Sequence, residues 1–205
     1  SLTKYINGTS DCVAGCVCST LEFVSQMTDI NSGAAMLLGP VLDSYRAASI
    51  MKNIHSLHIR IKKHSENAQY LAENFEKLGC KVFYPGLQNH NGYNLLKEIM
   101  NGGFGFGGML AIDAGTTEKA NEFMARMQIE KVGYLAVSLG YFKTLFSSPG
   151  HSTSSEIPEE ERKAMGLSEG LVRISIGLDN DIKKTYERIK KCLQTRFYDI
   201  YSKHL

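Results

Sequence analysis

Hydrophobic and polar positions follow a helical period over one long stretch of the chain. Between Leu57 and Leu78 apolar residues recur every three or four positions, which places them on one face of a helix. Gly79 follows and suits the left-handed position that ends a helix. The pattern predicts a long helix that buries one face. The stripe consists of Leu57, Ile61, His64, Ala68, Leu71, Phe75 and Leu78.

Shorter apolar runs alternate with helical patterns along the rest of the chain. Short runs of apolar residues, with β-branched residues among them, predict a strand within 11–24 and strands at 81–84, 109–112, 134–137 and 171–176. The first five residues resemble the edge of a strand that runs into a turn at Asn7 and Gly8. Helices are predicted at 94–100, from about 116 to 127, at 158–166, and from Asp179 or Asp181 to Ile200. This alternation predicts an α/β fold.

Size and charge exclude several classes of protein. The 205 residues carry a net charge of +2, so a strong electrostatic case for nucleic acid is excluded. No apolar run approaches the ~20 residues that span a bilayer, so we expect no membrane partner. Five cysteines, an odd number in a chain of this length, do not suggest a disulfide framework. We expect a cytoplasmic protein.

The beginning of the chain and its middle bear on domain organisation. The sequence starts with Ser1 and shows neither an initiator methionine nor a signal segment. We expect it to be part of a longer protein. A domain boundary is predicted near residues 56–62, at the start of the long helix.

Three motifs suggest functions that their context does not support. Residues 103–108 match G-x-G-x-x-G, but a strand follows them where a dinucleotide site needs a helix. Cys12, Cys16 and Cys18 lack a second Cys/His pair at zinc-finger spacing, so buried strand cysteines are expected and no metal is predicted. His64 lies on the apolar stripe, so we expect a core or interface histidine.

Candidate chemistry lies at the two ends of the chain. Ser1, Thr3 and Lys4 place two hydroxyls beside an amine; lysine forms an imine with an aldehyde cofactor, and short hydroxyls can hold its phosphate. Arg173 stands on an alternating strand, where a guanidinium can bind a carboxylate in a fork or form a surface salt bridge. Ser138, at the end of another strand, is a third candidate for the same pocket.

These segments together resemble the pyridoxal-phosphate enzymes of cysteine and methionine metabolism. The resemblance runs through nearly the whole chain, and segments 36–40 (MLLGP) and 152–156 (STSSE) are most similar to the plant-type methionine γ-lyases of that family. The segments that carry the family resemblance are 1–11 (SLTKYINGTSD), 64–68 (HSENA), 84–87 (YPGL), 106–109 (FGGM), 136–140 (AVSLG), 158–162 (PEEER) and 170–177 (GLVRISIG).

The resemblance implies a fold and a role for each candidate residue. It implies the C-terminal part of an aminotransferase-like (fold-type I) enzyme, with residues 1–58 ending the large cofactor-binding domain and 59–205 forming a small α/β domain. Lys4 matches the imine lysine, and Ser1 and Thr3 match ligands of the cofactor phosphate. Arg173 matches the clamp on the substrate carboxylate. Ser138 matches a serine that positions the lysine and itself lies near that carboxylate.

The resemblance also implies an activity and an assembly. Val137 stands where members acting on cystathionine often carry glutamate, which favours an uncharged thioether substrate. We expect γ-elimination of the amino acid L-methionine to methanethiol, 2-oxobutanoate and ammonia, in a homotetramer. Cystathionine γ-lyase, O-acylhomoserine sulfhydrylase and cystathionine γ-synthase activities remain alternatives, as does a truncated, non-catalytic assembly module.

Overall fold

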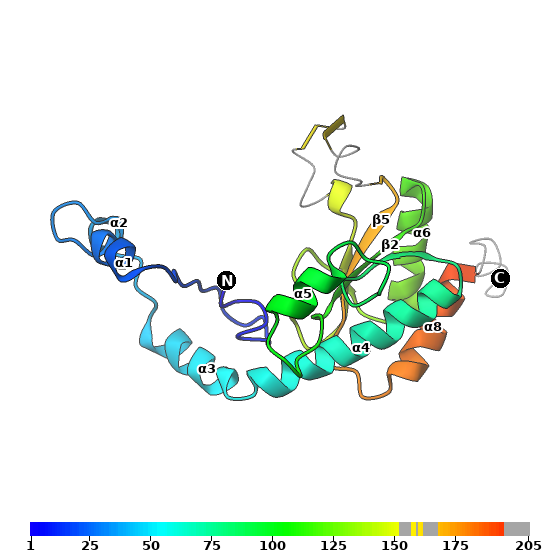
Figure 1. Ribbon diagram of the computed structural model, residues 1–205, viewed down its shortest axis with the longest axis horizontal. Coiled ribbons are helices and arrows are strands. Elements are labelled where there is room, and N and C mark those ends of the chain that lie inside the picture. Colours follow the sequence, from blue (N-terminus) through cyan, green and yellow to red (C-terminus); the bar gives the residue numbers. More distant parts are fainter. Residues whose placement is uncertain (152–156, 159, 162–167, 195–205) are drawn as a thin grey trace. The chain divides into compact units, whose positions relative to one another are not determined.

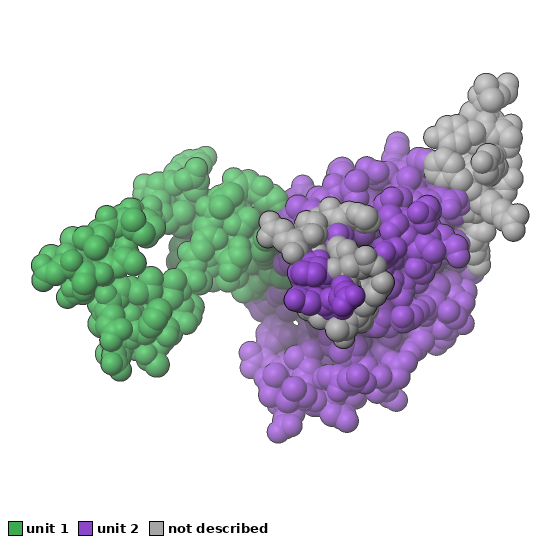
Figure 2. Space-filling view, turned by 90° about the horizontal axis from the view of Figure 1, so that it is seen from above, with its two compact units in different colours: residues 1–57 green, residues 58–205 purple. Residues whose placement is uncertain are grey.

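The computed structural model describes residues 1–151, 157, 158, 160, 161 and 168–194, with the side chains of His151 and Gln194 left aside. Its contacts divide the chain into two compact units, residues 1–57 and 58–205, which Figure 2 distinguishes by colour. Each unit is described by itself.

Unit 1 consists of a turn, an extended segment and short helices. The helices are α1 (Leu21–Met27), α2 (Ala34–Leu38) and α3 (Ser44–Ile54). Thr20 and Asp43 begin α1 and α3 as N-caps, because their side-chain oxygens accept hydrogen bonds from the first-turn amides of Phe23 and Arg46. Cys12 and Ile50 are the buried apolar residues of this unit. Unit 1 therefore has almost no core of its own.

Two expectations for unit 1 are wrong in this structure. The described chain forms no strand at 1–5 or within 11–24; residues 3–7 form a turn, 11–20 are extended without a ladder, and α1 begins at Leu21. Cys12 is buried as expected, but Cys16 and Cys18 are exposed. A strand needs a neighbouring strand to accept its hydrogen bonds, and no described segment of unit 1 offers one.

Unit 2 is built on a five-stranded sheet in the order β1-β2-β5-β4-β3. The strands are β1 (Lys81–Phe83), β2 (Met109–Asp113), β3 (Tyr134–Leu135), β4 (Leu145–Ser147) and β5 (Leu171–Ser175). Neighbours pair antiparallel except β3 and β4, which are parallel. The long central pair, β2 with β5, aligns Ala111 with Arg173.

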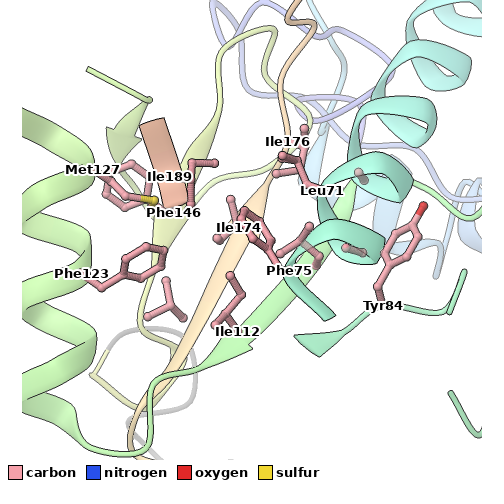
Figure 3. Close-up of a cluster of buried hydrophobic side chains, with 14 of the residues drawn as sticks. Leu71, Phe75, Tyr84, Ile112, Phe123, Met127, Phe146, Ile174, Ile176 and Ile189 are labelled. Carbon is pink, nitrogen blue, oxygen red and sulfur yellow. The ribbon is translucent and has the colours of Figure 1, made fainter. Parts of the chain in front are cut away.

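Helices cover one face of this sheet (Figure 1). They are α4 (Leu57–Lys77, of which His58 onward belongs to unit 2), α6 (Thr117–Ile129) and α8 (Ile182–Gln194); α5 (Tyr93–Ile99) is a short helix before β2. Alternate strand residues point into the core because side chains alternate along a strand. Figure 3 shows Ile112, Ile174 and Phe146 from the strands packed among Phe75 of α4, Phe123 and Met127 of α6, and Ile189 of α8.

Most of the predicted elements of unit 2 are confirmed. The stripe of α4 is buried from His64 to Phe75, and Gly79 has φ +81° after the helix. Asp181 caps α8, accepting a hydrogen bond from the Lys184 amide at 3.1 Å. The G-x-G-x-x-G segment is a loop that enters β2, with positive φ at three of its glycines. The strand β4 and the 3₁₀ turn Pro149–His151 are additional to the prediction.

Some predictions fall on residues outside the described part of the chain. Segment 152–156, most of the helix expected at 158–166, and Phe197 and Ile200 of the final helix belong to this group.

Candidate active site

The candidate cofactor lysine lies in a tight turn of unit 1. The amide of Gly8 donates to the carbonyl of Lys4 at 2.7 Å, and the amide of Asn7 donates to the carbonyl of Leu2 at 2.9 Å. Gly8 has φ +77°, a conformation that residues with a Cβ avoid. The Lys4 side chain is half-buried. The turn therefore fixes the backbone from which the amine projects.

A polar cluster holds this turn in place. The Asn7 side chain, almost fully buried, donates to Asp11 Oδ1 at 2.7 Å and accepts from Asn53 Nδ2 of α3 at 2.8 Å. Thr9 also donates to Asp11 at 2.7 Å. Hydrogen bonds from Asn7 and Thr9 lower the pKa of Asp11 below its usual value, because they stabilise the charged carboxylate. The cluster connects the lysine turn to α3 within unit 1.

The donor set of this turn fits pyridoxal phosphate. Aldehyde capture needs a primary amine, which Lys4 supplies, and phosphate binding needs short donors such as the exposed Ser1 hydroxyl. Thr3 Oγ1 already donates to the Ala14 carbonyl at 3.2 Å and accepts from the Ala14 amide at 2.9 Å. In this arrangement Thr3 fixes the turn against the extended segment, and its hydroxyl proton would have to rotate away from Ala14 to reach a phosphate.

The candidate carboxylate clamp lies on the sheet face away from the helices. Val172 and Ile174 point into the core, so Arg173 between them points to the opposite face. Its cross-strand neighbours are small: Ala111 on β2 and Ser147 on β4. Small neighbours leave room for a guanidinium beside them. Arg173 is half-buried, as a clamp that must stay reachable requires.

The chain from β3 to β4 brings Ser138 to this arginine. Parallel strands require the connection, residues 136–144, to return to the end at which β3 began. It runs beside β5, where Arg173 Nη2 donates to the carbonyl oxygen of Ser138 at 3.3 Å and the Gly140 amide donates to Ser175 Oγ at 3.0 Å. Arg173 and Ser138, far apart in sequence, therefore meet in unit 2.

Two further residues shape this second site. Val137, next to Ser138, is 58% exposed and presents an apolar side chain. Ser175 was not predicted, yet its buried hydroxyl holds the return connection. Its position two residues after Arg173 on an alternating strand was the available signal, because residues at that spacing share a face.

The structure thus describes the predicted residues as two sets. Ser1, Thr3 and Lys4 lie at or just before one turn of unit 1, whereas Arg173 contacts Ser138, the chain neighbour of Val137, in unit 2. His64 is a core residue as expected: it is fully buried, and its Nδ1 lies 2.6 Å from the carbonyl oxygen of Ile176. No helix in the described part of the chain is both long and apolar enough to span a membrane.

Several known proteins are similar to nearly the whole chain. The chain is 42% identical over 192 residues to methionine gamma-lyase of Arabidopsis thaliana, covering 93% of this chain and 44% of that protein. It is 35% identical over 199 residues to cystathionine beta-lyase of Lactococcus lactis (strain MG1363), covering 92% and 49%. Among solved structures, yeast cystathionine gamma-lyase matches with a TM-score of 0.84 at 29% identity, covering 95% and 48%.

The family comparison covers the described parts of both units. The chain spans about half the length of the relatives that it matches. The family described as "Cys/Met metabolism PLP-dependent enzyme" matches residues 1–193. The chain therefore belongs to the family of pyridoxal-phosphate-dependent enzymes of cysteine and methionine metabolism.

Proposed function

We propose that the protein containing this chain is a carbon–sulfur lyase that cleaves L-methionine into methanethiol, 2-oxobutanoate and ammonia. The observation that carries the proposal is the pairing of Arg173 with the Ser138 turn beside the exposed Val137. The 42% identity to an Arabidopsis methionine gamma-lyase supports the same substrate.

Lys4 is the proposed catalytic base. When bound, pyridoxal phosphate supplies an electron sink that makes the Cα–H bond of an amino acid acidic. The freed Lys4 amine would take the proton from Cα and carry protons at Cβ, so that the thiol can leave from Cγ. The bonded turn from Leu2 to Gly8 limits the positions that the amine can reach. Ser1 and Thr3 would hold the phosphate beside it.

Arg173 and Ser138 are the proposed orienting residues. A guanidinium binds a carboxylate through two parallel hydrogen bonds, which fixes the orientation of the amino acid and hence of its Cα–H bond. The bond from Arg173 to the Ser138 carbonyl restrains the guanidinium before substrate arrives. Ser138 would in turn position the lysine.

Val137 is the proposed determinant of substrate preference. Its apolar side chain favours an uncharged thioether tail over the charged second amino-acid head of cystathionine. Cystathionine lyase activity is the competing proposal, because relatives of that name match at 34–35% identity. O-acylhomoserine sulfhydrylase and cystathionine γ-synthase activities are further alternatives.

We also propose that the chain is the C-terminal part of a fold-type I enzyme. Residues 1–58 would end the large domain and 59–205 would form the small one. The many exposed apolar side chains of unit 1 support this proposal, since a complete domain would cover them. A cytoplasmic homotetramer is the expected form.

Product analysis tests the substrate. The full-length protein, loaded with pyridoxal phosphate, is incubated separately with L-methionine, L-cystathionine and O-acetyl-L-homoserine. We expect methanethiol and 2-oxobutanoate from methionine at the highest kcat/KM. A higher kcat/KM with cystathionine would overturn the methionine assignment and support the competing one.

The first test variant is Lys4→Ala. It should abolish turnover and the visible absorbance of the cofactor bound to lysine, because no other amine occupies that position. Lys62→Ala, a change at an exposed lysine of α4, is the matched control and should leave both unchanged. Turnover retained in Lys4→Ala would contradict the assignment. Absence of cofactor binding by the unaltered full-length protein would instead support a non-catalytic assembly module.

The second test variant is Arg173→Ala. It should raise KM for methionine roughly 10- to 100-fold with a smaller change in kcat, because a charge-assisted bond to the substrate is lost. An unchanged KM would refute the role of Arg173 as the carboxylate clamp.

A further inference from the structure

Unit 2 contains a cavity that the proposed reaction does not use. It has a volume of about 560 Å³, within the range of roughly 300–1,000 Å³ typical of small-molecule sites. The end of α6, the return connection before β4, the segment after β5 and one side of α8 line it. Neither Ser138 nor Arg173 is among its lining residues.

Three cationic side chains from three different elements line this cavity. They are Lys131 after α6, Lys143 before β4 and Arg188 on α8. Lys131 has φ +53°, a turn conformation in which a glycine or asparagine is more usual. Lys143 lies with its Nζ 5.9 Å from the centre of the Phe142 ring. Separate elements thus bring positive charge to one place.

These cations are not neutralised within the described part of the chain. Neither lysine forms an ion pair with a described residue, and the same holds for Arg188. Asp179 supplies the one carboxylate among the lining residues. Its oxygens accept bonds from the Thr185 hydroxyl and the Asp181 amide, so they are committed to the start of α8. The cavity therefore keeps an excess of positive charge.

Neutral donors accompany the cations. Gln128 and Asn180 also line the cavity, and their amide groups can donate hydrogen bonds to anionic oxygens. Like charges that share a cavity repel one another, and an anion bound between them removes that repulsion. A ligand with a single charge would leave part of the excess uncompensated.

We propose that this cavity binds a compact polyanion, a small molecule with two or more negative charges carried by phosphate or carboxylate groups. Lys131, Lys143 and Arg188 bind the charges, and the amides of Gln128 and Asn180 bind the remaining oxygens. The site is distinct from the proposed active site, because none of these residues belongs to it.

Calorimetric titration of the full-length holoenzyme tests the proposal, with inorganic pyrophosphate and citrate as separate probes. Cofactor is kept in excess, and its visible absorbance must not change, so that displacement of its phosphate does not contribute. We expect saturable binding of at least one probe with one site per chain, weakened by added NaCl. If only pyrophosphate binds, the site is selective for phosphate groups, and if only citrate binds, it is selective for carboxylate groups. If both bind, the site recognises negative charge without distinguishing the two groups.

Charge-reversal variants locate the site. Arg188→Glu should weaken binding about tenfold or more, and Lys143→Glu, on an exposed loop, should do the same if the first variant folds poorly. Lys184→Glu is the matched control: it makes the same charge change on α8 at a residue that does not line the cavity, and should change affinity less than about twofold. No saturable binding of either probe, or an equal loss in Lys184→Glu, would overturn the proposal.

Discussion

The two units of this chain bury their apolar residues to very different extents. In unit 2, one continuous cluster joins α4, α6 and α8 to the sheet, and residues such as Phe75 and Ile174 are fully buried. In unit 1, Leu21, Leu38 and Tyr45 are each more than 80% exposed. Apolar surface of this kind stabilises a fold only when it is removed from water.

The comparison shows that well-capped helices are not sufficient for a unit to be stable by itself. Both units have well-capped helices, and the N-caps of α1 and α3 are as regular as that of α8. Caps and helical propensity contribute about 1 kcal/mol each, whereas short helices need packing to persist. Unit 2 therefore has a core that can stabilise it, whereas unit 1 has almost none within its 57 residues.

Separating the units gives the largest expected effect. Residues 58–205 expressed alone should show a cooperative thermal transition by circular dichroism, since their core is complete. Residues 1–57 alone should show none, because Cys12 and Ile50 cannot offset the entropy of ordering the chain. A cooperative transition in residues 1–57 would break the comparison.

Removing one large side chain from each unit should give the next largest effect. Phe75→Ala leaves a cavity in the core of unit 2 and should lower the free energy of unfolding by about 3–5 kcal/mol. Phe23→Ala, at a half-exposed position of α1, should lower it by less than about 1 kcal/mol in the same chain. Urea titration measures both. Equal losses would show that unit 1 has a core after all.

Ser175→Ala should have a smaller effect, confined to unit 2. It leaves the buried Gly140 amide without its acceptor, which costs roughly 1–3 kcal/mol in the free energy of unfolding. In the full-length enzyme KM should rise several-fold because the Ser138 turn loosens. Ser25→Ala, an exposed serine of α1, is the control in unit 1 and should leave stability and KM unchanged. An unchanged KM in Ser175→Ala would show that the turn is held by its other bonds.

The smallest expected effect is a difference in pH dependence. Burial lowers the pKa of His64 below 6.5, and nearby Arg60 adds to the shift, so the folded state favours the neutral ring. This contribution to the stability of unit 2 is complete above pH 6.5 and is lost as the pH falls through the folded pKa. Melting temperatures of the unaltered chain and of His64→Gln are measured between pH 7.5 and 5. We expect the unaltered chain to melt at the higher temperature at pH 7.5, and the difference to shrink as the pH falls.

In unit 1, the carboxyl of Asp11 also has a lowered pKa. Hydrogen bonds from Asn7 and Thr9 lower the pKa of Asp11 below 3.8, so its contribution is complete above that value and is lost only in stronger acid. An identical pH dependence in His64→Gln and the unaltered chain would exclude His64 as the source of the difference.

Periodicity determined most of unit 2 in advance. The stripe of α4, the position of Gly79 and the alternation of β5 follow from local pattern and backbone conformation, and the structure confirms them. The strand expected within 11–24 failed because an apolar run shows only that a segment can be buried. Whether it pairs depends on a partner strand, which the local pattern does not contain.

The candidate site divides in the same way. Residue types suggested the amine of Lys4 and the guanidinium of Arg173 as candidates, and the resemblance to the family gave each its expected role. Only the tertiary structure decided that Ser138 reaches Arg173: the parallel pairing of β3 with β4 requires the connection to return beside β5, where Ser175 holds it. Strand order is set by long-range pairing, and no local pattern encodes it.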